Sequence, residues 1–228
     1  MNDWKLPRDA LAPIREAGAD RPFVVAQLGQ SLDGRIATAS GESRYISGEP
    51  AIDHLHRLRA CVDAVVVGAG TIVADDPSLT VRLVAGRSPA RVAIDPNGRL
   101  GPDGKWLARD GVRRLLVSAA GRAPSGADLV RLPLRDGLLA PADIIEALAQ
   151  RGFRKILIEG GALTISRFLG AGCLDRLHVL VAPVILGSGK PGLDLAPIAS
   201  LANALRPVVE TYDLGGGEIL FDCALRTN

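Results

Sequence analysis

The sequence predicts an α/β fold with a mixed, mostly parallel central sheet, helices on both faces of the sheet and an antiparallel hairpin near the C-terminal end. Short aliphatic runs recur along the chain, which is typical of strands buried on both faces. Segments with helical spacing of apolar residues lie between several of these runs, as in βαβ units. The tail differs, because two β-like segments flank three glycines at 215–217, and such a turn is a hairpin signal.

The individual elements follow from the spacing of apolar residues and from the turn residues between them. The first helix has Ser47 as its expected N-cap, because a serine hydroxyl accepts hydrogen bonds from the first N–H groups of a helix. Residues 1–21 are expected to form an N-terminal arm and residues 22–228 a single domain. Two stretches rich in glycine and proline, 96–113 and 187–204, are expected to be surface loops. Strands are predicted at 23–28, 64–67, 91–94, 114–117, 155–158 and 176–182, helices at 49–60, 143–150 and 162–169, and the hairpin strands at 206–214 and 218–225.

Composition excludes several classes of protein. The chain carries 27 basic and 25 acidic residues, interspersed and without a basic stripe, so nucleic-acid binding is not expected. The three cysteines lack metal-type spacing and are expected to be free thiols, with no metal site. Residues 1–21 contain no apolar h-region, and no apolar run reaches the roughly 18 residues of a membrane span. These features predict a cytoplasmic protein that does not bind a membrane.

The strongest candidate for an anion site is Glu159-Gly160-Gly161, between a predicted strand and a predicted helix. Glycines at such a turn expose backbone N–H groups, and the helix N-terminus favours negative charge. Thr164 and Ser166 add hydroxyl groups nearby. Because the full dinucleotide-binding fingerprint is absent, a purely structural tight turn is an equally good interpretation.

A second glycine turn follows the strand at 64–67 and begins with Gly68. It leads to two adjacent aspartates and then to Arg82, which could contact a phosphate or lie in solvent. Two such turns on one sheet suggest one ligand lying across several strand ends. Polar loops at 31–34 and 39–43 are candidates to contact a sugar or phosphate, although any polar loop has this composition.

The histidines do not indicate a catalytic site. His54 and His56 are two positions apart on a predicted helix and therefore point to different sides, and His178 lies in a predicted strand. The sequence contains neither the zinc-deaminase signature nor a G-x-S-x-G nucleophile turn.

Five motifs together resemble the pyrimidine reductase of riboflavin synthesis, which occurs alone or as the C-terminal half of a bifunctional deaminase–reductase. The resemblance runs from about residue 21 to residue 189 and implies a three-layer dihydrofolate-reductase-like fold, NADPH as cofactor and a homodimer. The implied reaction is hydride transfer to C1′ of the ring-opened ribosylamino group of a phosphoribosylamino-pyrimidine. The motifs are QSLDGRIA at 30–37, ASGES at 39–43, LRA at 58–60, VGAGTIVADDPSLTVR at 67–82 and IEGGA at 158–162.

The resemblance also implies a role for individual residues. Arg59 and Arg82 would bind the ribose phosphate, Glu159 would accept a hydrogen bond from a ribose hydroxyl or the pyrimidine, and Asp75 would be catalytic by orienting the nicotinamide or relaying a proton. The implied substrate contacts are Ser43, Arg59, Leu79, Arg82 and Glu159. The implied cofactor contacts are Gly29, Tyr45, Thr71, Asp75, Pro96, Gly161, Ala162, Leu163, Thr164, Ile165, Ser166 and Arg167.

The sequence departs from the family pattern at two positions and lacks a deaminase half. Many bacterial members have lysine where Gln27 stands and tryptophan where Tyr45 stands. Two alternatives therefore stay open: a reductase of the same fold that acts on a dihydropterin or another pyrimidine, and a nucleotide-binding protein without turnover.

Overall fold

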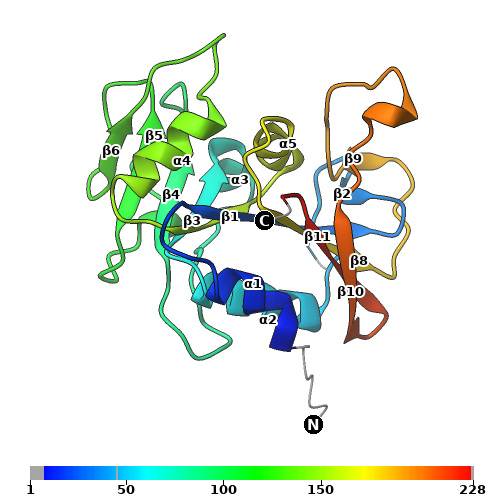
Figure 1. The fold of residues 1–228 in the computed structure, drawn as a ribbon. Helices are drawn as coiled ribbons and strands as arrows, with labels where there is room; N and C mark the ends of the chain where they lie inside the picture. Colours follow the sequence, from blue (N-terminus) through cyan, green and yellow to red (C-terminus); the bar gives the residue numbers. More distant parts are fainter. Residues whose placement is uncertain (1–7, 45, 227–228) are drawn as a thin grey trace.

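A computed structural model describes residues 8–44 and 46–226 and confirms the α/β fold class. Within these residues, a nine-stranded sheet has the order β10-β11-β8-β1-β7-β3-β4-β5-β6 (Figure 1). Its strands are β1 (Phe23–Ser31), β3 (Ala64–Gly68), β4 (Ala90–Ile94), β5 (Arg114–Ser118), β6 (Asp128–Arg131), β7 (Lys155–Glu159), β8 (Arg176–Ala182), β10 (Val208–Gly215) and β11 (Glu218–Ala224).

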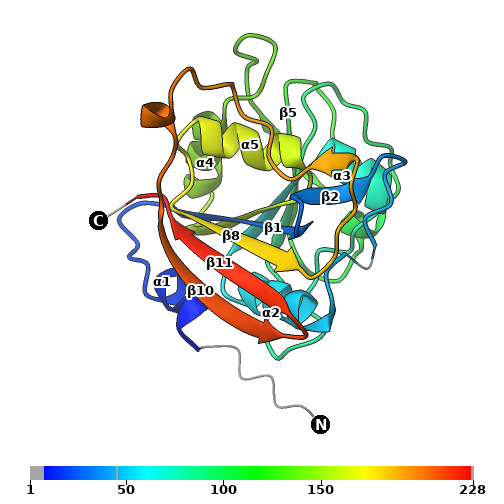
Figure 2. The same ribbon diagram turned by 90° about the vertical axis from the view of Figure 1, so that its right-hand side faces the viewer.

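The central strands pair in parallel, whereas β11 pairs antiparallel with both β8 and β10. The predicted C-terminal hairpin is therefore confirmed, and it continues the main sheet beyond β8 (Figure 2). Parallel strands are covered on both faces, which explains why the central strands consist almost entirely of buried residues.

Helices cover both faces of the sheet, which makes three layers (Figure 1). The core on one face contains buried side chains of α4 and α5, and the core on the other contains side chains of α1, α2 and α3. The helices are η1 (Arg8–Leu11), α1 (Ala12–Arg15), α2 (Glu49–Ala60), α3 (Ala69–Asp75), η2 (Lys105–Leu107), α4 (Pro141–Ala149), α5 (Ala162–Gly170) and η3 (Leu201–Asn203). No helix in the described ranges has both the length and the apolar character needed to span a membrane.

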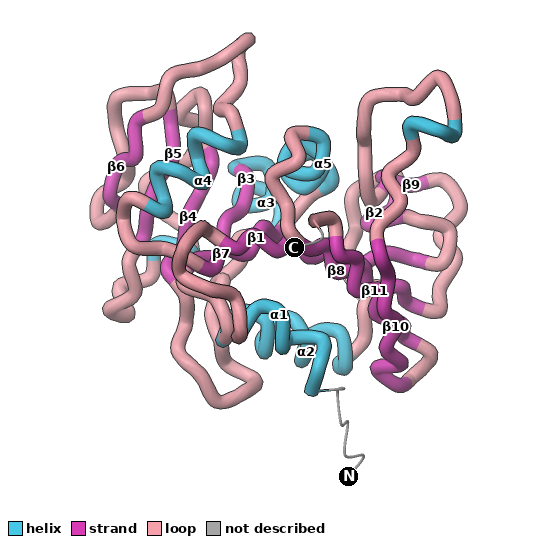
Figure 3. The backbone as a smooth tube through the Cα atoms, viewed as in Figure 1, coloured by secondary structure: helices cyan, strands magenta, loops and turns pink. Residues whose placement is uncertain are grey.

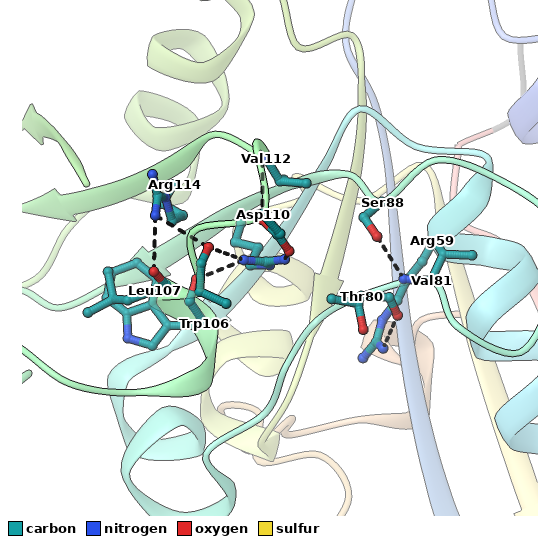
Figure 4. A network of polar contacts seen from close by, with 11 residues as sticks. Arg59, Thr80, Val81, Ser88, Trp106, Leu107, Asp110, Val112 and Arg114 are labelled. Atoms are coloured by element: carbon teal, nitrogen blue, oxygen red, sulfur yellow. Dashed lines mark hydrogen bonds and ion pairs between the residues drawn. The ribbon is translucent and has the colours of Figure 1, made fainter. Parts of the chain in front are cut away.

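Three segments expected to lie outside the core contribute to the packing. The described part of the N-terminal arm, residues 8–21, includes η1 and α1, and its Ile14 is fully buried. The loop at 96–113 buries Trp106 completely, and Arg114 donates to the carbonyl of Leu107 (Figure 4). The loop at 187–204 contains β9 (Gly189–Pro191), which pairs with β2 (Arg35–Thr38) in a second small sheet. Figure 3 shows the long loops that surround these two strands.

The expected N-cap at Ser47 is wrong. Gly48 occupies the N-cap position of α2 and has no side chain to accept the first N–H groups. The buried carboxylate of Glu218 replaces it, because it accepts from the backbone N–H groups of Gly48 at 2.7 Å and Ala51 at 3.3 Å. The negative charge of Glu218 at the helix N-terminus also interacts favourably with the helix dipole. No local sequence pattern reveals this cap, because Glu218 is 170 positions away from Gly48 in the sequence.

Candidate active site

A row of buried polar side chains crosses four neighbouring strands. Glu159 on β7 is opposite Gln27 on β1, Gln27 is opposite His178 on β8, and His178 is opposite Asp222 on β11. Residues in register on neighbouring strands project to the same face of a sheet. All four are buried, and α2 covers them, since its His54 and Arg59 contact the row directly.

Arg59 forms a bidentate ion pair with Glu159. Its Nε and Nη2 atoms donate to the two carboxylate oxygens, both at 2.7 Å, and the two side chains are only 7% and 9% exposed. Burial lowers the pKa of Arg59, but the carboxylate of Glu159 outweighs it and leaves that pKa above its ordinary value. Nη1 of Arg59 donates to the carbonyl of Thr80 at 3.1 Å (Figure 4). Arg59 therefore connects α2 to the end of β7 and to the segment that leads to Arg82.

Backbone groups of the segment from Thr80 to Arg82 bind three side chains, two from α2 and one from the loop that follows the segment. The carbonyl of Thr80 accepts from Arg59, the N–H of Val81 donates to Ser88 Oγ at 3.0 Å, and the N–H of Arg82 donates to His56 Nδ1 at 3.1 Å. The Arg82 side chain is exposed and has no hydrogen bond or ion pair with another described residue. Its guanidinium is therefore available to an external anion.

Leu79 precedes this segment in a left-handed backbone conformation, with φ of 55°. Its side chain is 1% exposed and packs in the core beneath the site. Only its backbone is available for the contact with substrate that the resemblance implies.

The two histidines of α2 do point to different sides, as expected. His54 Nε2 lies 3.0 Å from His178 Nδ1, and His178 Nε2 lies 3.2 Å from a carboxylate oxygen of Asp222. Burial and the neighbouring His178 lower the pKa of His54 to about 3. Burial, together with Arg59 and Arg82, lowers the pKa of His56 to about 4. Both imidazoles are therefore neutral near pH 7.

The two glycine turns contact one another. Gly160 has φ of 109°, and a Cβ there would lie 2.7 Å from Thr71 Oγ1, while the Gly161 N–H donates to the same hydroxyl at 3.0 Å. In return, a Cβ on Gly68 would lie 2.5 Å from Thr164 Oγ1. The first residues of α3 and α5 thus lie against each other at the carboxyl ends of β3 and β7. Glu159 is the last residue of β7 and directly precedes the second glycine turn.

A surface depression beside α5 is lined by residues that are far apart in the chain. Pro96, Thr164 and Arg167 line it together with apolar side chains from β4, α4 and α5. Ala162 is half-buried and Leu163 is exposed at the start of the same helix. Two other implied cofactor residues face inward: the Ile165 side chain is in the core, and the Ser166 hydroxyl accepts from the N–H of Asp194. A ligand at α5 would meet only their backbone.

The structure describes three further predicted site residues. Asp75 ends α3 and is exposed, and its carboxylate has no hydrogen bond or ion pair within the described ranges. Gly29 lies close to Ser47, because a Cβ at position 29 would be 2.4 Å from the Ser47 hydroxyl oxygen. Ser43 is half-buried in the same loop as Ser47. Tyr45 lies outside the described residues.

The polar loop at 31–34 has a structural explanation. The Asp33 carboxylate accepts from Ser31 Oγ at 2.6 Å and from the N–H groups of Leu186 and Gly187. These hydrogen bonds, with that of Ser31 the largest contributor, lower the pKa of Asp33 to about 2. Asp33 therefore fixes the turn after β1 to the loop after β8.

Among the residues described, no cluster of three or more His, Cys, Asp or Glu side chains is arranged to bind a metal.

Sequence reasoning missed His56 and Ser88. Helical spacing does place His56 and Arg59 on one face of α2, three positions apart. His56 and Arg59 both bind the segment from Thr80 to Arg82 because the loop after α3 returns to α2. No local sequence pattern specifies that return.

Comparisons with known proteins show the family of the chain. The family model of the RibD C-terminal domain matches residues 22–212. A riboflavin biosynthesis protein RibD of Mycobacterium tuberculosis is 32% identical over 95% of this chain, and the chain spans 60% of that relative. A 2,5-diamino-6-ribosylamino-4(3H)-pyrimidinone 5′-phosphate reductase of Methanothermobacter thermautotrophicus is 33% identical, and the match covers 86% of this chain and 94% of the relative.

Solved structures show the same fold. A Thermotoga maritima deaminase/5-amino-6-(5-phosphoribosylamino)uracil reductase superposes with a TM-score of 0.80 and 26% identity, over 90% of this chain and 57% of that one. A dihydrofolate reductase of Enterococcus faecalis, complexed with NADP(H), superposes with a TM-score of 0.53 and 10% identity, over 90% and 97%. The dihydrofolate-reductase-like fold is thereby confirmed, and the chain belongs to the RibD C-terminal domain family.

Proposed function

We propose that this chain is an NADPH-dependent reductase of riboflavin synthesis. Its substrate would be 5-amino-6-(5-phosphoribosylamino)uracil or the 2,5-diamino-pyrimidinone counterpart, and its product the ribitylamino compound. The observation that carries this proposal is the position of Glu159. This residue ends β7, binds Arg59 of the substrate side, and is followed directly by the glycine turn of the cofactor side.

The donors around that turn fit a dinucleotide phosphate. The N-terminus of α5 presents backbone N–H groups, and Thr164 and Arg167 line the adjoining depression with Pro96. Glycine at 160 allows the backbone to turn sharply against Thr71. A bound nicotinamide cofactor would supply the hydride, and selection of NADPH over NADH is part of the proposal.

The substrate side would bind and orient the phosphorylated sugar. The exposed guanidinium of Arg82 would bind the phosphate through charge-assisted hydrogen bonds. Glu159, fixed in place by Arg59, would accept a hydrogen bond from a substrate hydroxyl or the pyrimidine. Arg59 would orient Glu159 and Thr80 with three of its five N–H groups, and the two that remain would bind the substrate phosphate together with Arg82. Asp75 is proposed to relay a proton or orient the nicotinamide.

The test is to mix the purified chain with NADPH and each of the two pyrimidines and to follow the loss of NADPH absorbance. Oxidation with either pyrimidine, and slower oxidation of NADH, would support the proposal. Oxidation only with a dihydropterin would identify a reductase of the same fold with another substrate, which Gln27 at the centre of the polar row keeps open. Binding of NADPH without turnover on any substrate would indicate a non-catalytic nucleotide-binding protein.

We also propose that the enzyme is a cytoplasmic homodimer. Within the described residues, β10 ends the sheet and has one unpaired edge. Val208 and Val209 on this strand are 62% and 44% exposed, and Leu201 and Leu205 before it are also exposed. An exposed apolar strand edge is suited to pair with a second copy about a two-fold axis. Val208→Lys should give a monomer by sedimentation, and Leu134→Lys, an exposed leucine near β6, should not.

A further inference from the structure

We infer that His56 and Ser88 are positioning residues of the reductase: they fix the backbone of Val81 and Arg82 so that the Arg82 guanidinium faces the substrate. This inference rests on the proposed function and adds two residues to it. Neither residue belongs to the motifs that resemble the family.

Three consecutive residues are fixed by side chains and not by a strand ladder. Thr80, Val81 and Arg82 each use one backbone group to bind Arg59, Ser88 and His56 respectively, at 3.1, 3.0 and 3.1 Å. Figure 4 shows the bonds of Thr80 and Val81. The segment lies outside every described strand, so these side chains supply the constraint that a sheet would otherwise give.

The neighbouring backbone makes this constraint necessary. Leu79, directly before the segment, adopts φ of 55°, a left-handed conformation that is unfavourable for a residue other than glycine. After the segment, Gly86 approaches α2 so closely that a Cβ would lie 2.6 Å from the Cβ of Ala60. The backbone is therefore strained directly before the segment and lies against α2 after it.

His56 is suited to accept this hydrogen bond at working pH. An imidazole nitrogen accepts only when it carries no proton, and the Nδ1 atom faces the N–H of Arg82. The charged groups around the ring are Arg59 and Arg82, which disfavour its protonation, and Glu159 and Asp53, which favour it. Burial adds to the effect of the arginines and lowers the pKa of His56 to about 4. The acceptor is thus present throughout the neutral range.

Two matched substitutions separate the hydrogen bond from the bulk of the side chain. His56→Asn keeps an acceptor atom on Cγ, where Nδ1 stands, whereas His56→Gln moves the acceptor one bond further out. We expect His56→Gln to raise the KM for the phosphorylated pyrimidine about fivefold, the effect of one lost hydrogen bond. His56→Asn should stay within about twofold of the wild type, and the KM for NADPH should change in neither variant. Ser88→Ala should behave like His56→Gln, and Ser88→Thr like His56→Asn.

A double substitution tests whether His56 acts through Arg82. In an Arg82→Ala background, His56→Gln should no longer affect the KM for the pyrimidine, because the group that it positions is gone. Equal KM values for His56→Gln and wild type would overturn the inference. So would additive effects of His56→Gln and Arg82→Ala, or a rise in the KM for NADPH that matches that for the pyrimidine.

Amide hydrogen exchange decides the same question without substrate. Exchange at Val81 and Arg82 should be faster in His56→Gln and Ser88→Ala than in the wild type, and unchanged in His56→Asn. Unchanged exchange in all variants would overturn the inference even in an active enzyme. Inactivity of the wild-type chain with both pyrimidines would instead overturn the proposed function, and the exchange rates would still show whether His56 and Ser88 fix the segment.

Discussion

Arg59 and Glu159 face each other in a buried bidentate ion pair, with both nitrogen–oxygen distances at 2.7 Å. The two residues are 100 positions apart, and their contact fixes α2 to the end of β7. Because the glycine turn begins at the next residue, the pair also joins the proposed substrate side to the proposed cofactor side.

Removing one partner of this pair should destabilise the fold strongly. Arg59→Ala leaves the carboxylate of Glu159 buried without its cation, and such a change typically costs about 3–5 kcal/mol. We expect that loss in the free energy of unfolding from a urea titration. The control is Arg57→Ala on the same helix, whose exposed pair with Asp53 should cost under about 0.5 kcal/mol. Similar losses for the two variants would show that the buried pair contributes no more than a surface one.

Arg82→Ala should weaken substrate binding and leave the fold intact. The guanidinium is exposed and has no partner among the described residues, so its removal exposes no buried group. Loss of a charge-assisted contact to phosphate typically costs about 1.5–3 kcal/mol, roughly a 10- to 150-fold rise in the substrate Kd. The NADPH Kd and the melting temperature should not change. Arg87→Ala removes an exposed arginine from the same loop and is the control, with an unchanged Kd expected. An unchanged substrate Kd in Arg82→Ala would remove Arg82 from the site.

Most of the fold was predictable because its signals are local. Each of the central strands is an aliphatic run, and the hairpin is marked by its glycines. The short strands β2 and β9 were missed because neither is long enough to show a repeating apolar pattern, and their pairing with each other is a tertiary contact. The cap of α2 was missed for a similar reason, since Glu218 comes from the far end of the chain.

The candidate site was predictable in its parts but not in its contacts. The glycine turns at Gly68 and Gly160 are visible as strand-to-helix junctions, but their mutual packing through Thr71 and Thr164 is a tertiary fact. The use of Arg59 as a partner of Glu159 likewise depends on the approach of α2 to β7. The register of β1 is needed to see that Gln27 lies beside Glu159.

Gly160 and Gly161 should respond differently to the same substitution. Gly160→Ala adds a Cβ at φ of 109° and 2.7 Å from Thr71 Oγ1, which should cost roughly 1–3 kcal/mol of stability. Gly161→Ala adds a Cβ at an ordinary φ of −68° and 3.5 Å from the same oxygen, and should be nearly neutral. Thermal unfolding of both variants measures the difference, and equal melting temperatures would contradict it.

Gly161→Val tests the proposed cofactor site separately from the fold. The branched side chain at the N-terminus of α5 should obstruct the approach of a pyrophosphate to the backbone N–H groups. We expect a folded protein with weakened NADPH binding, measured by fluorescence titration, and Gly161→Ala as the control of smaller volume. If NADPH binds Gly161→Val normally, the turn is only structural.

The stability of the protein should fall as the pH is lowered from 7 to 5. His54 is buried beside His178, and its pKa is lowered to about 3, whereas an unfolded histidine titrates near 6.5. Between these values the unfolded state binds more protons than the folded state, so stability rises with pH and is lost on acidification. His54 should contribute roughly 1–2 kcal/mol of loss by pH 5, and His56, whose pKa is lowered to about 4, adds to the loss in the same window. The carboxylates of Asp33 and Asp222 have lowered pKa values and contribute only below about pH 4, so they do not disturb this window.

Urea titrations at pH 5, 6 and 7 measure the slope of the free energy of unfolding against pH. This slope should become shallower in His54→Gln. An unchanged slope in that variant would show that another group binds the proton.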